Sequence, residues 1–155
     1  IYLHLQLPEA AAYHATALEQ QPDAYAPAVR LRLELGRYVQ AEDYVRAREG
    51  ASALRREVDA ALEQCDVLVL PTLPICPPRI GEDTVRVGGA DHPVRALMLR
   101  LTQLFDLTGH PAMSIPCGFT RSNLPVGLQI VGRRFETDRL LRCGCALETA
   151  LARRE

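Results

Sequence analysis

The sequence has 155 residues, of which 48% are hydrophobic and 24% are charged, with a formal net charge of −1. These values predict one compact domain over residues 1–155 and exclude disorder of the whole chain. All 18 basic residues are arginine, so a lysine-dependent phosphate loop, a lysine Schiff base and a serine–lysine pair are excluded for this chain alone. The scattered basic residues, the aromatic content of 5% and the short apolar runs argue against nucleic acid and against a membrane span.

The first third of the chain predicts one strand and three helices. Apolar and polar residues alternate over residues 1–7, as in a half-buried strand. A helix is expected over about 8–20, because Pro8 suits a first turn, and a second over 27–36. The longest helix is expected over 40–65, where apolar residues recur every three to four positions and the opposite face is charged.

The middle of the chain predicts short elements joined by loops. Residues 67–70, which read VLVL, predict a strand that is buried on both faces. Eight of the eleven prolines lie between residues 71 and 125, which indicates a loop-rich region, and Gly88-Gly89 can close a small hairpin. Residues 94–108 predict one helix, which Gly109 ends.

The last third of the chain predicts two strands and a helix. Residues 112–118 and 126–132 have strand patterns and are separated by turn-forming residues. Thr137 can cap a final helix, with Arg153 and Arg154 near its negative C-terminal end. Because strands alternate with helices, an α/β architecture with a sheet covered by helices is expected.

Cysteine and histidine provide no clear catalytic or metal site. The five cysteines show no C-x-x-C spacing, which predicts reduced thiols, a cytoplasmic protein and no metal. Cys117 is either a nucleophile that needs a nearby histidine or, as we favour, an inert buried thiol. Cys143 and Cys145 would point to different sides of a helix. His110 is either a polar group at a site or a loop residue.

Three segments, in order, resemble motifs of the amidase signature family. The segment Asp66–Pro74 resembles its D-x-x-x-x-P-T-x-P motif. Thr102 and the run 106–118 resemble the block T-x-x-x-N-x-T-G-x-P-A-x-S-x-P-x-G, although Asp106 stands where the family usually has Asn and His110 where it usually has an apolar residue. The segment 124–132 is similar to the family strand LPVGLQIIG.

This resemblance implies a fold and an activity. Family members have a mixed β-sheet covered by helices, and they hydrolyse or transfer amides with a Ser nucleophile, a second Ser in a cis peptide linkage and a Lys; backbone N–H groups hold the oxyanion. The chain has no lysine and no tandem serine, so no catalytic residue is assigned to it. We therefore expect the C-terminal portion of such an enzyme, without its N-terminal catalytic half and with no cofactor.

The resemblance favours a hydrolytic amidase over the related subunit of glutamine-using amidotransferases. That subunit usually carries an Asp shortly before the conserved Thr, where this chain reads Leu97–Leu101, and residues 13–36 look more like the hydrolases. The amidotransferase stays an alternative, and so does a non-catalytic folding or interaction remnant. The expected partners are the missing N-terminal part, a small amide substrate and, through exposed strand edges, a second copy of the chain.

The resemblance also points to a wall of the substrate pocket. In the resembling enzymes the stretch around Thr102 borders the acyl site, and Leu99 and Phe105 would share its helix face. These three residues, with His110 as a further candidate, are the predicted substrate-binding residues. The alternative is that the apolar stripe packs into the core, as such stripes usually do.

Overall fold

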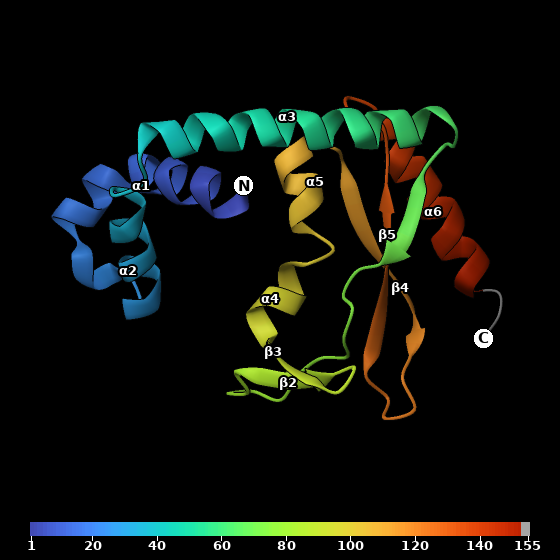
Figure 1. Cartoon of the computed structure of the whole chain (residues 1–155). Coiled ribbons are helices and arrows are strands. Elements are labelled where there is room, and N and C mark those ends of the chain that lie inside the picture. Colours follow the sequence, from blue (N-terminus) through green and yellow to red (C-terminus); the bar gives the residue numbers. More distant parts are fainter. Residues whose placement is uncertain (153–155) are drawn as a thin grey trace. The chain divides into compact units, whose positions relative to one another are not determined.

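The computed structural model describes residues 1–152, so the expected role of Arg153 and Arg154 lies outside the described residues (Figure 1). The chain divides into two compact units, residues 1–54 and the residues from 55 onward, and the boundary falls inside helix α3 (Ala41–Glu63). The single domain expected from the length stays a prediction.

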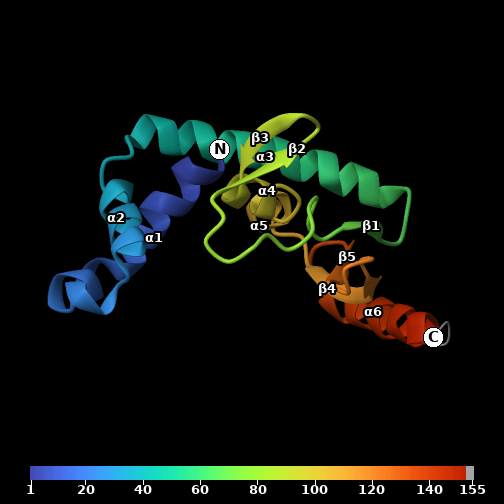
Figure 2. The same cartoon turned by 90° about the horizontal axis from the view of Figure 1, so that it is seen from below.

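The first unit is built from helices. It contains α1 (Tyr2–Gln20), the short 3₁₀ helix η1 (Pro22–Ala24), α2 (Pro27–Gly36) and the first part of α3, and α1 and α2 lie side by side (Figure 2). The strand expected over residues 1–7 is therefore wrong. This segment holds no β-branched residue after Ile1, and its leucines are good helix formers.

The contact between α1 and α2 depends on a glycine. Gly36 is buried, and a Cβ atom there would overlap the carbonyl oxygen of Leu7 and lie 2.8 Å from the Cβ of Ala11. The backbone of α1 cannot move aside as a flexible side chain can, because its carbonyl groups are fixed in the helix. The absence of a side chain at Gly36 is what lets the two helices approach.

We expect Gly36→Ala to destabilise the protein by about 1–3 kcal/mol, the usual cost of overpacking a close contact. Urea unfolding followed by circular dichroism measures the change. Gly50→Ala is the matched control, because its new Cβ would meet the flexible end of the Ile1 side chain, 2.7 Å from Cδ1. Equal stability of the two variants would contradict the close-approach role of Gly36.

The second unit is organised around a three-stranded sheet. Its order is β1 (Leu68–Pro71), β5 (Pro125–Val131) and β4 (Ala112–Phe119), and both pairings are antiparallel. Val131 in the central strand pairs with Leu68 on one side and Ala112 on the other. The mixed sheet that we expected is therefore wrong for residues 1–152, where no parallel pair occurs.

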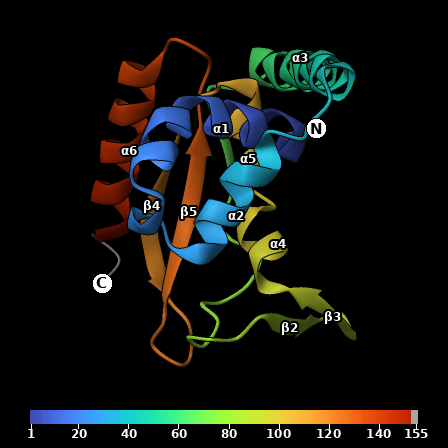
Figure 3. The same cartoon turned by 90° about the vertical axis from the view of Figure 1, so that its left-hand side faces the viewer.

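Helices cover both faces of this sheet, as Figure 3 shows. The end of α3 and α5 (Gln103–Thr108) pack on one face, and α6 (Thr137–Ala152) packs on the other. The first core contains Val58, Leu62, Phe105 and Val131. The second core contains Ile115, Ile130 and Leu140. The α/β layering with helices over a sheet is confirmed for the second unit.

Helix α6 begins at Thr137, which is its first residue and not the cap that we expected, and its first turn is acidic. The backbone N–H of Arg139 and the side chain of Arg142 stabilise the Asp138 carboxylate and hold its pKa below the ordinary value. The guanidinium of Arg142 donates to Asp138 over 2.9 Å. Across residues 1–152, none of the helices is both long and apolar enough to cross a bilayer.

Two further expectations need correction. The VLVL segment is not buried on both faces: Val69 is 54% exposed, because β1 is the outer strand of the described sheet. The single helix expected over 94–108 is two helices, α4 (Val94–Leu99) and α5. Between the two helices, the carbonyl of Leu101 accepts a hydrogen bond from Nε2 of Gln129 over 2.9 Å. Gln129 lies in β5, so this bond joins the segment between the helices to the sheet.

The other predicted elements are present, but the first helix begins at Tyr2, so Pro8 lies inside α1 and not in its first turn. The strands β2 (Thr84–Val87) and β3 (Ala90–Pro93) form the small hairpin, and Gly88 and Gly89 both have positive φ in its turn. The turn between β4 and β5 also needs a left-handed residue, which Asn123 supplies at φ 58. Such residues close tight hairpins at little cost.

Candidate functional site

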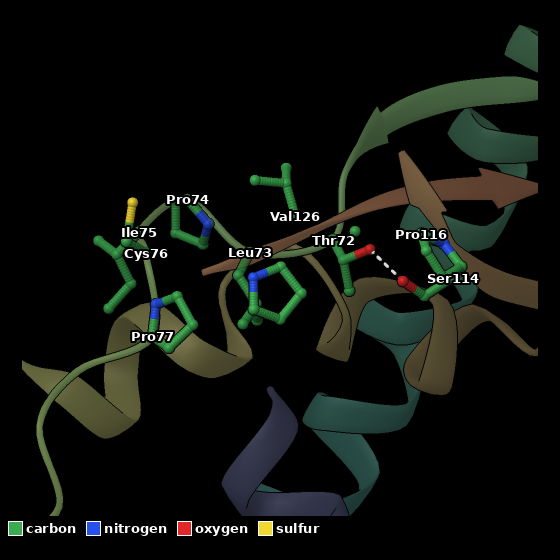
Figure 4. Close-up of a pocket in the computed structure, with 11 residues that line it drawn as sticks. Thr72, Leu73, Pro74, Ile75, Cys76, Pro77, Ser114, Pro116 and Val126 are labelled. Atoms are coloured by element: carbon green, nitrogen blue, oxygen red, sulfur yellow. Dashed lines mark hydrogen bonds between the residues drawn. The ribbon is translucent and has the colours of Figure 1, made fainter. Parts of the chain in front are cut away.

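A hollow of about 550 Å³ lies where three segments of the second unit meet (Figure 4). The loop that follows β1 supplies one side, and facing positions of β4 and β5 supply the other. The lining residues are Thr72, Leu73, Pro74, Ile75, Cys76, Pro77, Ser114, Pro116, Pro125, Val126 and Gly127. Prolines fix φ along much of this rim, so the hollow has stiff walls.

Two hydroxyl groups form the polar centre of the hollow. The Oγ1 of Thr72 and the Oγ of Ser114 are 2.6 Å apart and share a hydrogen bond, drawn as a dashed line in Figure 4. The backbone N–H of Thr72 donates to the carbonyl of Gly127 over 2.9 Å, which continues the β1–β5 pairing past the end of β1. Sheet geometry therefore holds both hydroxyl groups in place.

Gly127 keeps this centre open. A Cβ atom there would lie 2.6 Å from the Oγ of Ser114 and 2.8 Å from the Oγ1 of Thr72. Any side chain at Gly127 would push into the hydroxyl pair. The glycine is thus required by the close approach of two side chains.

The predicted pocket residues do not line this hollow. Leu99 lines a separate hollow of about 330 Å³ beside the β2–β3 hairpin. Thr102 is half-buried at the start of α5, and its hydroxyl donates to the carbonyl of Leu99 over 3.4 Å. Phe105 is 5% exposed and packs into the first core. The interruption of the helix separates these residues, so they share no continuous helix face, and their role as substrate-binding residues stays a prediction.

His110, the fourth predicted residue, lies in a buried polar cluster. Its Nδ1 is 2.9 Å from the hydroxyl of Thr108, and its Nε2 is 3.0 Å from a carboxylate oxygen of Asp59. Arg55 donates to the Thr108 carbonyl over 2.9 Å, and Nε of Arg134 lies 3.7 Å from Asp59. The sequence of carboxylate, imidazole and hydroxyl resembles a nucleophilic triad, but Thr108 is 0% exposed and cannot reach a substrate here.

Cys117 occupies a β-bulge. The β4–β5 register shifts between Pro116 and Gly118, and the extra residue turns its thiol toward the carbonyl of Val126, 3.4 Å away. Within residues 1–152, no imidazole is hydrogen-bonded to this thiol, and no group of three or more potential ligands could hold a metal ion. The favoured interpretation was an inert buried thiol, but Cys117 is only half-buried, and its lack of reactivity stays a prediction.

Sequence reasoning missed the hollow, although both of its hydroxyl residues lie within the family motifs. Thr72 stands in the segment PTLP and Ser114 in the segment AMSIP, 42 residues apart. Their chemistry becomes visible only when the sheet brings the two segments together on either side of Gly127.

The comparisons agree on one family. A profile of the family described as Amidase matches residues 6–141. An amidase of Pseudomonas putida is 39% identical over 149 residues, covering 94% of this chain and 31% of the relative. A glutamyl-tRNA(Gln) amidotransferase subunit of Nocardia farcinica is 38% identical over 133 residues, covering 81% of this chain and 26% of the relative.

A crystal structure of an amidase superposes with a TM-score of 0.82 at 34% identity, covering 92% of this chain and 33% of that one. The layered sheet and helices thus match part of an amidase fold. The chain belongs to the amidase signature family. It spans 31% of the length of the Pseudomonas putida amidase and 26% of that of the Nocardia farcinica subunit.

Proposed function

We propose that this chain is the C-terminal portion of an enzyme that hydrolyses amides. It supplies sheet strands and one wall of the substrate pocket, while the catalytic Ser, cis-Ser and Lys belong to a portion that precedes it. One observation carries this proposal: the chain matches amidases over most of its length yet contains no lysine and no adjacent serines.

The hollow supports the role in the substrate pocket. It lies beside the outer strands β1 and β4, and hydroxyl groups and apolar side chains line it. Sites for small molecules are commonly apolar with a few polar groups. No strand among residues 1–152 pairs with the outer edges of β1 and β4, and these edges offer the remaining portion of the enzyme a place to pair.

A second function, that of the subunit of a glutamine-using amidotransferase, is favoured by the 38% identity to the Nocardia farcinica protein. Hydrolysis ranks first, because the amidase of Pseudomonas putida aligns over 149 residues and the amidotransferase protein over 133. The two functions differ in substrate, since the amidotransferase would use the side-chain amide of glutamine.

The proposal predicts that the 155-residue chain alone does not hydrolyse amides but completes an enzyme that lacks the corresponding segment. In the test, these residues replace the matched segment of the Pseudomonas putida amidase. We expect the chimera to release ammonia from simple aliphatic and aromatic amides, measured with a coupled ammonia assay.

Two controls accompany the chimera. The same amidase without any replacement segment should be inactive, and the chimera with its own catalytic Lys replaced by Ala should be folded and inactive. Amide turnover by the isolated chain, retained after Cys117→Ala, would contradict the proposal. A chimera that is folded but inactive would favour a non-catalytic remnant, and one that acts on glutamine alone would favour the amidotransferase.

A further inference from the structure

We infer that the hollow between the 72–77 loop and the β4–β5 strands binds an uncharged carboxamide, with its amide group on the paired hydroxyl groups of Thr72 and Ser114 and its apolar chain against the lining. This inference rests on the proposed function, because it names the class of substrate that the wall accepts. Neither Thr72 nor Ser114 was among the residues expected to bind substrate.

Among residues 1–152, none of those that line the hollow carries a carboxylate, imidazole or guanidinium group. Apolar side chains contribute most of it, including Leu73, Ile75 and Val126. A charged group that entered would lose water without meeting a counter-ion, which is costly. An uncharged chain or ring loses nothing comparable and gains from the burial of its apolar surface. The lining therefore disfavours the binding of charged ligands.

The hydroxyl pair leaves one donor for a ligand. Each hydroxyl has one proton, and the 2.6 Å bond between Thr72 and Ser114 uses one of the two. The other proton and the remaining lone pairs are available at the polar centre of the hollow. Such a pair can donate to the carbonyl oxygen of an amide or accept from its N–H, so a ligand with one amide group matches it.

The volume and the chemistry together favour simple carboxamides over α-amino acid amides. A hollow of about 550 Å³ is within the usual size range of small-molecule sites. Glutamine carries an ammonium and a carboxylate beside its amide, and the lining offers neither charge a partner. Hexanamide has the same kind of amide on an uncharged chain.

The test uses the 155-residue chain labelled with ¹⁵N and two probes with the same six-carbon chain, the uncharged hexanamide and the anionic hexanoate, with L-glutamine as a third. We expect hexanamide to shift the backbone signals of Thr72, Ser114 and Gly127, and hexanoate and glutamine to bind at least about 10-fold more weakly, because an unpaired charge is costly to bury. Equal binding of the three probes, or no shift at these residues with hexanamide, would overturn the inference.

Variants of the hydroxyl pair test its role as the anchor. Thr72→Val and Ser114→Ala should each weaken hexanamide binding by about 2- to 10-fold, the worth of one neutral hydrogen bond. Thr84→Val is the matched control, because Thr84 lies on the β2–β3 hairpin and does not line the hollow. Ile75→Arg should raise the affinity for hexanoate and lower that for hexanamide. Unchanged affinities in all three hollow variants would contradict the anchor.

The chimera separates this inference from the proposed function. There, Thr72→Val and Ser114→Ala should raise the KM for hexanamide more than they lower kcat, while Thr84→Val leaves both unchanged. An active chimera whose KM is the same in all variants would overturn the inference and keep the proposed function. If hexanamide binds at the hollow but the folded chimera is inactive, the inference stands and the proposed function is overturned.

Discussion

Replacing Phe105 by alanine is expected to lower the free energy of unfolding by about 3–5 kcal/mol, the usual cost of removing a buried aromatic ring. The side chain is 5% exposed and packs with Val58, Leu62 and Val131, between the end of α3 and the sheet. Its loss would leave a cavity that sheet and helix backbones cannot close. Urea unfolding monitored by circular dichroism measures the change.

The other two phenylalanines are matched controls. Phe119 is 65% exposed and Phe135 is 92% exposed, so their replacement by alanine should change stability by less than about 1 kcal/mol. In the chimera, Phe105→Ala should leave the ranking of acyl groups unchanged. A small loss of stability together with an altered ranking would instead show that Phe105 lines the substrate pocket, as the family resemblance predicts.

Replacing His110 by leucine is expected to cost about 2–4 kcal/mol, because it removes the partner of two polar groups at once. Thr108 is fully buried and would keep a hydroxyl without its imidazole partner, and Asp59 would lose the group 3.0 Å from its carboxylate. Leucine has a similar volume, so the loss reports on hydrogen bonds more than on packing. Urea unfolding at pH 7 measures it.

A second substitution separates the cost of the unpartnered Thr108 hydroxyl from the rest of the loss of stability. When Thr108→Val is added to His110→Leu, an apolar pair replaces the hydroxyl–imidazole contact, and part of the lost stability should return. His4→Leu is the control at an exposed histidine and should be nearly neutral. If His110→Leu were as stable as His4→Leu, the buried cluster would have no structural role.

Local patterns predicted the long helices well, because their apolar residues recur at helical spacing and the turns between them contain Pro or Gly. The error at residues 1–7 arose from a period-2 pattern in residues that favour helices; Leu3 ends up 54% exposed, so one leucine of the alternation faces water. At the break in the helix, the carbonyl of Leu101 accepts a hydrogen bond from Gln129, which lies 28 residues away, so this contact could not be seen locally.

The family could be predicted from the sequence, because its motifs occur in order, but the hollow between the 72–77 loop and strands β4 and β5 could not. The expected stripe assumed a continuous helix through Thr102, and the structure starts a new helix there. The hollow depends on Thr72 and Ser114 meeting across Gly127. That proximity is a property of strand order, which spacing along the chain does not reveal.

The strand order β1-β5-β4 also has a consequence for the time course of folding. As the chain emerges from the ribosome, β1 is complete at Pro71, yet its only partner among the described strands, β5, ends at Val131. The turn between β4 and β5 is short, so the entropy of closing that hairpin is small, whereas β1 must close a far longer loop. We expect the β4–β5 hairpin to form first and β1 to dock on it last, completing the wall that carries Thr72.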